Sequence, residues 1–322
     1  MDLPILSVKG LHTYFYTYEG VVKAVRGVDF SIRKGETLGL VGETGCGKSV
    51  TALSIFRLIR PPGRIVKGEI RLKGENLVAK TEEEMMQIRG NRITMIFQEP
   101  MTSLNPVFRV GEQIAWVIML HQKKSAKDAM ALTVEMLRKV KIPQPEVVSE
   151  LYPHELSGGM RQRILTAMAL SCSPDLTVCD EPTTYLDTTT QAEVLELLGD
   201  LMKKSGSSTL YITHNLGVVA HICDRMAVMY AGKIVEVGKT RQVFKDPVHP
   251  YTQGLFNALP NPQKRTAELP SIPGLVPNMI DTPSGCLFHP RCSKAKEICS
   301  EKEPAQVTVG EDHEVACWMS PS

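Results

Sequence analysis

Short apolar runs of strand length alternate with segments of helical periodicity up to about residue 240. Such runs include "TLGLV" at 37–41, "ITMIF" at 93–97 and "LTVC" at 176–179. Strands that alternate with helices along a chain usually pair in parallel, with the helices covering the sheet. The pattern therefore predicts an α/β domain with a mainly parallel sheet.

This alternation ends where proline becomes frequent. Eleven of the 21 prolines lie from Arg241 onward, and the order of helices and strands there is hard to assign. We expect a boundary between about residues 240 and 260, which divides the chain into a first domain at 1–245 and a small, irregular second domain at 246–322. No internal repeat or low-complexity tract is evident.

The stretch "GETLGLVGETGCGKSVTALSIF" has the pattern of a strand, a glycine-rich turn and an amphipathic helix. It fits G-x-x-x-x-G-K-[ST], whose glycines let backbone N–H groups approach phosphate oxygens at a helix N-terminus. Lys48 would bring positive charge to the β- and γ-phosphates, and the Ser49 hydroxyl can ligate Mg²⁺. A chance glycine turn is the alternative, which the flanking elements disfavour. The residues expected to contact the nucleotide are Gly42, Thr44, Gly45, Cys46, Gly47, Lys48, Ser49 and Val50.

Two adjacent carboxylates end the apolar run at 176–179. Asp180 and Glu181 would be costly to bury at a strand end without a cation beside them. We expect Asp180 to hold the Mg²⁺ shell and Glu181 to orient and polarise the attacking water. Solvated acids would fit the same letters, but the phosphate loop favours a nucleotide site.

A second anion-binding helix start lies in "HELSGGMRQRILTAMAL". Ser157 is a good N-cap, and Gly158 and Gly159 leave the backbone uncluttered. One nucleotide does not need two such sites. The sequence resembles the ATPase subunits of ABC transporters, in which this signature completes the site of a partner subunit. The resemblance covers the whole chain and implies a P-loop fold: a RecA-like core with an antiparallel β subdomain and a helical subdomain at about 99–165.

The resemblance also assigns roles to three further residues, whose motifs follow in the family's order. Gln98, after "ITMIF", corresponds to the glutamine that meets Mg²⁺ and water and relays to the membrane subunit. Asp187 in "YLD" corresponds to the aspartate at the dimer seam. His214 in "YITHN" corresponds to the histidine that contacts the γ-phosphate.

Aromatic residues in "TYFYTY" are candidates to stack on adenine. Phe15 aligns best with the family, with Tyr14 and Tyr16 as close rivals, although an edge strand rich in aromatics would show the same letters. Two departures from the family pattern remove no chemical group. Tyr185 stands where a small residue is usual, and Cys179 replaces a common aliphatic residue.

Four of the eight cysteines lie in the tail with the spacing C-x5-C-x6-C-x17-C. No secretory pattern precedes them, so we expect reduced thiols, and clustered cysteines then indicate metal ligation or redox chemistry more than disulfides. Four thiolates suit zinc or an iron–sulfur cluster, and the spacing is not the paired C-x2-C of ordinary zinc ribbons. Cys172 and Cys223 are expected in the core.

The tail resembles the C-terminal extension of dipeptide and oligopeptide importer ATPases in "DPVHPYTQGLFNALP" and "PSGCLFHPRCSKAKEIC". This resemblance implies a [4Fe–4S] cluster, with Zn²⁺ as the alternative. We expect His249, His289 and His313 to have ordinary structural roles. The expected cluster ligands are Cys286, Cys292, Cys299 and Cys317.

Charge and hydropathy narrow the partners. The chain has 37 Lys and Arg residues and 35 Asp and Glu residues, so its formal net charge is 37 − 35 = +2. No block of like charge indicates a nucleic-acid-binding surface. No apolar run approaches the roughly 18 residues that span a bilayer.

We expect an ATPase at the cytoplasmic face of the membrane that powers peptide uptake by closing with a second ATPase subunit on shared ATP.

Two transmembrane permease subunits and an extracellular peptide-binding protein would be separate chains. The alternatives within the class are importers of nickel or another solute, because the nucleotide motifs do not report the cargo. The alternative from another class is a non-transport ABC ATPase that acts on nucleic acid.

Overall fold

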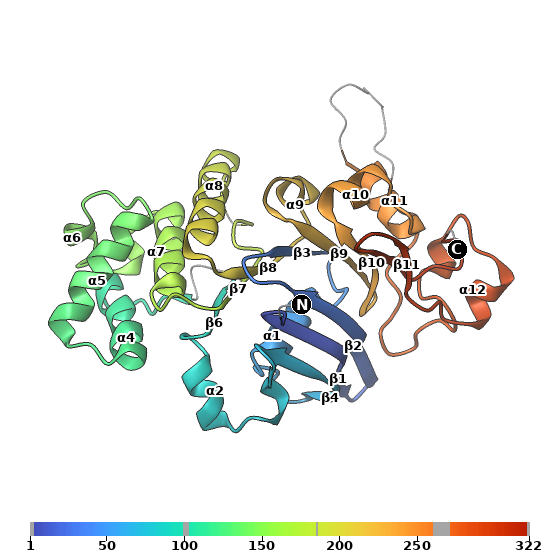
Figure 1. Cartoon of the computed structure of the whole chain (residues 1–322), viewed down its shortest axis with the longest axis horizontal. Coiled ribbons are helices and arrows are strands. Elements are labelled where there is room, and N and C mark those ends of the chain that lie inside the picture. Colours follow the sequence, from blue (N-terminus) through green and yellow to red (C-terminus); the bar gives the residue numbers. More distant parts are fainter. Residues whose placement is uncertain (1–2, 99–102, 185, 260–270, 321–322) are drawn as a thin grey trace. The chain divides into compact units, whose positions relative to one another are not determined.

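The computed structural model describes residues 3–98, 103–184, 186–259 and 271–320 (Figure 1). Residues 99–102, at the start of the predicted helical subdomain, and Tyr185 lie outside the described residues. None of the described helices is long and apolar enough to cross a bilayer. By its contacts the chain forms two compact units: unit 1 is Met1–Leu6, Ile32–Glu36 and Leu72–Tyr211, and unit 2 is Ser7–Ser31, Thr37–Arg71 and Ile212–Ser322.

The main sheet of unit 2 contains the strand that precedes the predicted phosphate loop. Its neighbouring strands follow the order β11-β12-β10-β9-β3. Leu38 of β3 lies opposite Arg225 of β9, and Val41 lies opposite Val228 in a parallel pair, so the predicted parallel pairing is confirmed here. The strands are β3 (Thr37–Val41), β9 (Arg225–Tyr230), β10 (Lys233–Lys239), β11 (Val307–Gly310) and β12 (His313–Val315).

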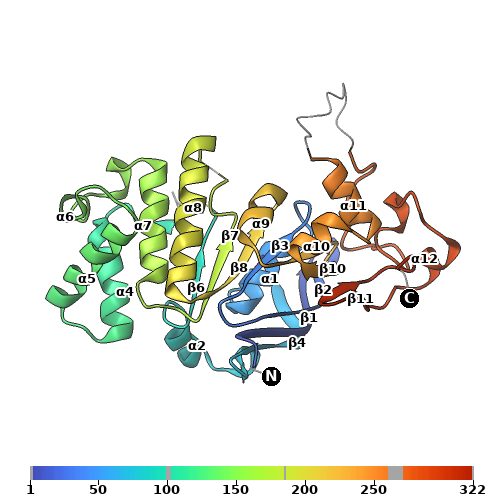
Figure 2. The same ribbon diagram turned by 45° about the horizontal axis from the view of Figure 1, so that its top comes forward.

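The proline-rich tail adds antiparallel strands to this sheet, which the sequence pattern did not reveal. Glu236 of β10 pairs with Val315 of β12, and β12 pairs in turn with β11. Ala231 and Gly232 join β9 to β10, and their φ angles of 44° and 82° suit a two-residue hairpin. With four and three residues, β11 and β12 are too short to show alternation. Helix α10 (Thr240–Lys245) precedes the tail, whose own helices are α11 (Pro250–Asn257) and α12 (Glu297–Glu301) (Figure 2).

Three longer strands, neighbours in the order β2-β1-β4, form a further sheet that lies mostly in unit 2. Along β1 the buried positions alternate until Gly10, whose φ of 53° interrupts the pleat, so that burial moves from Val8 to Leu11 and Thr13. Two helices of unit 2 follow strands of the main sheet. These elements are β1 (Leu6–Thr17), β2 (Gly20–Ile32), β4 (Gly63–Leu72), α1 (Lys48–Ile55) and α9 (Leu216–Ile222).

Two parallel strands position the predicted catalytic residues of unit 1. Ile96 of β6 lies opposite Cys179 of β7, so Gln98 and Asp180 come at the same end of neighbouring strands. Every residue of β7 is buried, as is usual for an interior parallel strand. The elements around them are β5 (Glu75–Asn76), α2 (Glu82–Ile88), β6 (Ile93–Ile96), β7 (Leu176–Asp180), α8 (Thr188–Ser205) and β8 (Ser208–Thr213), which ends in unit 2.

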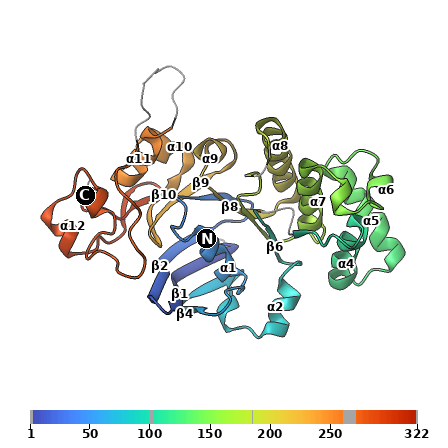
Figure 3. The same ribbon diagram turned by 180° about the vertical axis from the view of Figure 1, so that it is seen from behind.

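Helices of unit 1 pack around one apolar core (Figure 3). Helix α5 begins at Ser125, whose side chain accepts the Asp128 N–H, and buries Ala129, Thr133 and Leu137 at intervals of four residues. Side chains from the neighbouring helices complete the core. The helices are α4 (Val110–Gln122), α5 (Ala126–Lys139), α6 (Pro145–Val148) and α7 (Gly158–Leu170).

Candidate functional site

The predicted phosphate loop leads directly into α1, and its backbone admits only glycine at two positions. A Cβ on Gly42 would lie 2.1 Å from the Met229 carbonyl oxygen. Gly47, with φ of 106°, is the N-cap of α1, and a Cβ there would lie 2.4 Å from the Ala24 carbonyl oxygen. The loop is therefore packed closely against two other chain segments while its N–H groups remain at a helix N-terminus.

Lys48 is only 6% exposed and folds back over the loop. Its Nζ donates to the carbonyl oxygens of Gly42, at 2.8 Å, and Glu43, at 3.0 Å. Thr44 and Ser49 are exposed, whereas Cys46 is fully buried. Burial raises the pKa of the Cys46 thiol, and the nearby Lys48 charge offsets this only in part, so the thiol is neutral.

The aromatic candidates on β1 differ in their surroundings. Phe15 is half-buried, and its ring packs so closely on Gly63 that a Cβ there would lie 2.5 Å from the ring. Tyr16 is 40% exposed, with the Arg64 guanidinium 4.3 Å from its ring centroid. One face of Tyr16 thus already contacts a cation.

The predicted catalytic carboxylate and the predicted glutamine of unit 1 are brought together. Glu181 Oε2 accepts hydrogen bonds from Gln98 Nε2 at 3.3 Å and from Thr184 Oγ1 at 3.1 Å. Its φ is 47°, a left-handed conformation that costs a non-glycine residue about 1–2 kcal/mol. Asp180, one residue earlier, is 7% exposed at the end of β7.

The signature helix and the helix after "YLD" begin side by side in unit 1. Ser157 caps α7 by accepting the Met160 N–H at 3.3 Å. Asp187 caps α8 by accepting the Thr190 N–H at 3.0 Å, and this hydrogen bond lowers the pKa of Asp187. A Cβ on Gly159 would lie 2.7 Å from Thr190 Cγ2. Glycine therefore permits the two helix starts to approach.

His214 belongs to unit 2, as do the phosphate loop and the tail. It is exposed directly after β8. Asn215, the next residue, caps α9 by accepting the Gly217 N–H at 2.9 Å. The end of the strand and the helix cap together leave the His214 side chain at the surface.

The four tail cysteines line one small cavity in unit 2, together with His249 and His289. Within the described ranges, no three or more His, Cys, Asp or Glu side chains stand in the arrangement of a formed metal site. Backbone N–H groups nevertheless donate to two of the sulfurs, and such bonds favour thiolate over thiol. The donors are the N–H groups of Lys296 to Cys299, at 3.5 Å, and of Met319 to Cys317, at 3.4 Å.

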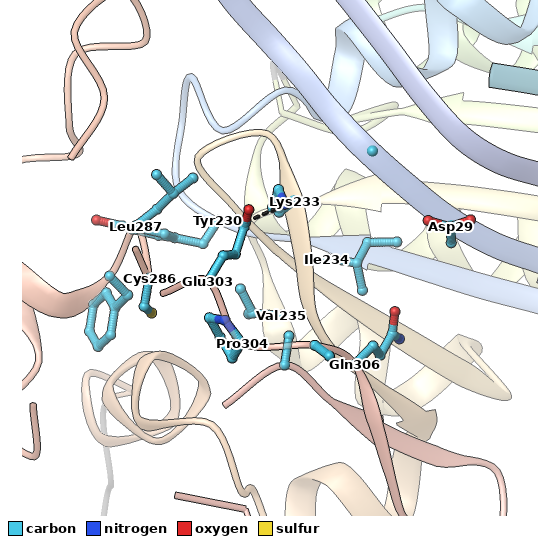
Figure 4. A pocket seen from close by; sticks show the side chains of 14 residues that line it. Asp29, Tyr230, Lys233, Ile234, Val235, Cys286, Leu287, Glu303, Pro304 and Gln306 are labelled. Atoms are coloured by element: carbon cyan, nitrogen blue, oxygen red, sulfur yellow. Dashed lines mark ion pairs between the residues drawn. The ribbon is translucent and has the colours of Figure 1, made fainter. Parts of the chain in front are cut away.

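Burial dominates the ionisation of three of these thiols, those of Cys286, Cys292 and Cys317. It raises the pKa of Cys286 to about 11 and also raises the pKa values of Cys292 and Cys317, while nearby backbone N–H groups lower them in part. Cys286 also borders a second cavity of about 360 Å³, beside the Lys233–Glu303 ion pair (Figure 4). A cation placed among these sulfurs would favour the thiolate forms.

The tail histidines already have partners in the chain. His249 accepts the Tyr251 N–H through Nδ1, and burial lowers the pKa of His249 to about 3. His289 Nδ1 lies 2.9 Å from the Cys286 carbonyl oxygen. His313 Nε2 lies 2.8 Å from Glu236 Oε1 in a buried pair.

Sequence reasoning missed a contact between the phosphate loop and the tail within unit 2. Arg291 makes two hydrogen bonds to the Glu43 carboxylate, and Tyr251 accepts the Glu43 N–H. Glu43 occupies a variable position of the loop pattern, and Arg291 lies between two of the predicted cysteine ligands. Only the opposite charges of Glu43 and Arg291 were visible in the sequence.

Comparisons with known proteins agree with these motifs. The sequence model of the ABC transporter family matches residues 25–184. The family model of the C-terminal region of oligopeptide/dipeptide transporters matches residues 235–299. A dimeric ATP-binding cassette in a post-hydrolysis state, bound to ADP and phosphate, has the same fold. Its TM-score is 0.66 at 24% identity, over 73% of this chain and 99% of that one.

Curated relatives match almost the whole chain. It is 50% identical to the oligopeptide transport ATP-binding protein OppD of Bacillus subtilis, over 98% of this chain and 88% of that protein. It is 47% identical to the dipeptide transport ATP-binding protein DppD of the same organism, over 98% of this chain and 94% of that protein. The chain therefore belongs to the family of ATP-binding subunits of oligopeptide and dipeptide ABC transporters.

Proposed function

We propose that this chain hydrolyses ATP to ADP and phosphate and thereby powers the import of di- or oligopeptides. The hydrogen bond between Gln98 and Glu181 carries the catalytic part of the proposal most directly, because it places a water-positioning amide on the predicted general base. The names of the two Bacillus relatives specify oligopeptide and dipeptide transport, which favours peptide over nickel as the cargo. The same names favour transport over an action on nucleic acid.

Each motif supplies its own chemical groups. Lys48 would exchange its two loop carbonyls for phosphate oxygens when nucleotide enters. Ser49 in unit 2, and Gln98 and Asp180 in unit 1, each carry a side-chain oxygen of the kind that suits Mg²⁺, and we propose all three as its ligands; the ion would neutralise charge on the phosphates when bound. Glu181 would accept a hydrogen bond from the attacking water, and His214 would contact the γ-phosphate.

A second ATPase subunit would complete each nucleotide site. The capped start of α7 at Ser157, with Gly158 and Gly159, presents N–H groups that could hold the partner's nucleotide. Asp187, at the adjoining helix start, would lie at the seam between the two ATPases. We propose that the signature of each subunit serves the phosphate loop of the other, and that the second subunit is a different ATPase, so that the pair is a heterodimer.

Apolar side chains exposed on and before α4 would receive the membrane subunits. Phe108 and Trp116 pack edge to face with centroids 4.8 Å apart, and both stay more than a third exposed. Leu120, one turn further along α4, is 68% exposed. Exposed apolar groups of this kind mark interaction surfaces. This supports a peripheral position at the cytoplasmic face of the membrane, beside two permeases that a peptide-binding protein serves from outside.

The four tail cysteines would hold a [4Fe–4S] cluster, with Zn²⁺ as the alternative. Their common cavity and the N–H donors to the sulfurs of Cys299 and Cys317 support a thiolate centre. Such a centre would contribute folding free energy to a region of short elements. We also propose the division into an ATPase domain at 1–245, with a helical subdomain at about 99–165, and an extension at 246–322.

Reconstitution tests the function. The chain is co-purified with its permeases, its second ATPase and its peptide-binding protein, and the complex is placed in vesicles. We expect labelled di- or oligopeptide to accumulate only with Mg-ATP, while nickel does not accumulate. ATP-dependent uptake of nickel without peptide would overturn the cargo, and co-purification with nucleic acid in place of permeases would overturn the class.

A further inference from the structure

A partly buried ion pair joins the tail to the phosphate loop within unit 2. Arg291 Nη1 and Nη2 lie 2.8 Å and 3.0 Å from the two carboxylate oxygens of Glu43. The Arg291 side chain is 5% exposed and that of Glu43 is 29% exposed. The other guanidinium hydrogen bonds go to two backbone carbonyls, with Nε 2.9 Å from the Pro273 oxygen and Nη2 3.3 Å from that of Ile272, and to the Tyr230 hydroxyl, which lies 3.4 Å from Nη1. This two-point geometry fixes direction as well as distance.

At the loop end of the pair, every polar group of Glu43 is engaged. Its N–H donates to the Tyr251 hydroxyl at 2.9 Å, and its carbonyl accepts from Lys48 Nζ at 3.0 Å and from the Cys46 N–H at 3.3 Å. A movement of Glu43 would therefore displace the lysine that meets the phosphates, as well as the loop backbone that surrounds them. The ion pair sets the position of a residue on which the phosphate-binding groups depend.

At the tail end, Arg291 closes a short 3-10 turn, His289–Arg291, between two of the cysteines. The His289 N–H donates to the Cys286 carbonyl at 3.0 Å, and the Cys292 N–H donates to the His289 carbonyl at 3.2 Å. Cys286 and Cys292 line the same small cavity. The backbone that carries Arg291 is thus held at both ends by residues of the cysteine site.

Packed aromatic side chains also link the tail segment to the phosphate loop, and they make the link between Arg291 and Glu43 rigid. Phe288, in the same tail segment, packs on Tyr230 and Tyr251 with ring centroids 5.2 Å and 5.4 Å apart. Tyr251 is fully buried and is the residue that accepts the Glu43 N–H. Close-packed side chains of this kind transmit displacement with little slack. A shift in the tail segment would therefore reach Glu43 by two routes.

We infer that Arg291 is a positioning residue for the phosphate loop, through which the state of the four-cysteine site sets nucleotide affinity. The inference rests on the proposed function only in taking the loop to be the ATP site. A bond that merely fastens the tail to the domain would affect stability and leave the affinity of the folded protein for nucleotide unchanged. Nucleotide affinity therefore separates the two roles.

The first experiment is a double-mutant cycle in the full chain, with the dissociation constant for a slowly hydrolysed Mg-ATP analogue measured by calorimetry. Arg291→Gln and Glu43→Gln should each weaken binding on the order of 10-fold, and the double variant should bind no more weakly than either single variant. Arg138→Gln is the matched control, because it removes an exposed pair with Glu146 in unit 1 and should leave affinity unchanged.

Stability is measured beside affinity. A lowered melting temperature with unchanged affinity in Arg291→Gln would overturn the positioning role. Should that variant not fold, Arg291→Lys takes its place, since lysine keeps the charge but cannot make two parallel N–H···O bonds. Unchanged affinity in Arg291→Lys would then be equally decisive. Lys48→Ala tests the proposed function separately: if it binds the analogue normally, the ATP site itself is wrongly assigned.

The second experiment asks whether the cysteine site acts through Arg291. Cys292→Ser should weaken analogue binding several-fold in the native background, and should have no further effect in Arg291→Gln. Cys172→Ser, in unit 1, is the control and should leave affinity unchanged. An equal loss from Cys292→Ser in both backgrounds, or no loss in the native one, would overturn the coupling.

Discussion

Glu181 stands in a backbone conformation that few side chains adopt. Its φ of 47° is held by the surrounding structure, including the hydrogen bonds from Gln98 and Thr184 to its carboxylate. Strain of about 1–3 kcal/mol persists where neighbouring structure fixes it, and such positions concentrate at functional sites. In this conformation the carboxylate lies within hydrogen-bond distance of Gln98, which follows the neighbouring strand β6.

Gly47 provides the first test at the residue scale. Gly47→Ala should weaken nucleotide binding about 10-fold or more, because its φ is positive and the new Cβ would meet the Ala24 carbonyl at 2.4 Å. Gly206→Ala is the control, since that glycine also has positive φ but has open space around it. Binding is measured by calorimetry. Equal affinities in the two variants would show that close packing of the loop is unimportant.

The functional role of a residue could be predicted from the sequence where a motif requires a particular chemical group. The contacts between residues of different motifs could not be predicted. The sequence indicated Lys48, Gln98 and Glu181 because charge, amide and spacing are visible in one dimension. It did not indicate that Gln98 bonds to Glu181, which depends on the register of two parallel strands. The pairing of Glu43 with Arg291 depends on how the tail folds, and neither residue belongs to a motif position.

At the scale of elements, α4 has two functional faces. Ile114 and Ile118 are fully buried in the core of unit 1, whereas Trp116 and Leu120 remain exposed. Helical periodicity separates such faces, since residues four apart lie on one side. The buried face stabilises the unit, and the exposed face is free to bind another chain.

Substitutions on the two faces should therefore have different effects. Ile114→Ala should lower the free energy of unfolding by about 2–5 kcal/mol, through lost burial and a cavity. Trp116→Ala should change stability little but reduce recovery of the permeases in affinity purification. Denaturant unfolding and pull-down of the tagged chain measure these outcomes. Full permease recovery with Trp116→Ala would count against this face as the docking surface.

Strands and helices differ in how readily the sequence predicts them. The alternation of β3, β6 and β7 with helices was visible because each buried strand is an apolar run. β11 and β12 were missed because they are short and only partly apolar, and they form through pairing with β10. Tertiary pairing, which local pattern does not contain, decides such strands.

At the scale of the whole molecule, the tail is part of the same compact unit as the phosphate loop. Its strands extend the main sheet of unit 2, and its cysteines meet in a cavity beside the loop's supporting residues. An irregular region with few long elements commonly needs a metal centre to fold. The proposed metal centre would account for the four cysteines that gather in the tail.

Purification without oxygen tests the metal centre. We expect brown protein with about four irons and four sulfides per chain, and loss of the colour in each of Cys286→Ser, Cys292→Ser, Cys299→Ser and Cys317→Ser. Cys172→Ser should keep the colour. Absorbance and elemental analysis measure both. Colourless protein with one zinc would replace the cluster by a zinc site, and metal-free protein with a protease-resistant tail would remove the centre altogether.

Phosphate release by the assembled importer tests the central claim, that this chain's ATP hydrolysis drives peptide uptake. Glu181→Gln should retain ATP but release phosphate about 100-fold more slowly, with peptide uptake lost in parallel, because the amide is a poorer acceptor for the proton of water. Glu193→Gln, an exposed change on α8, should leave both rates unchanged. Unchanged phosphate release in Glu181→Gln, or uptake that continues without it, would contradict the account.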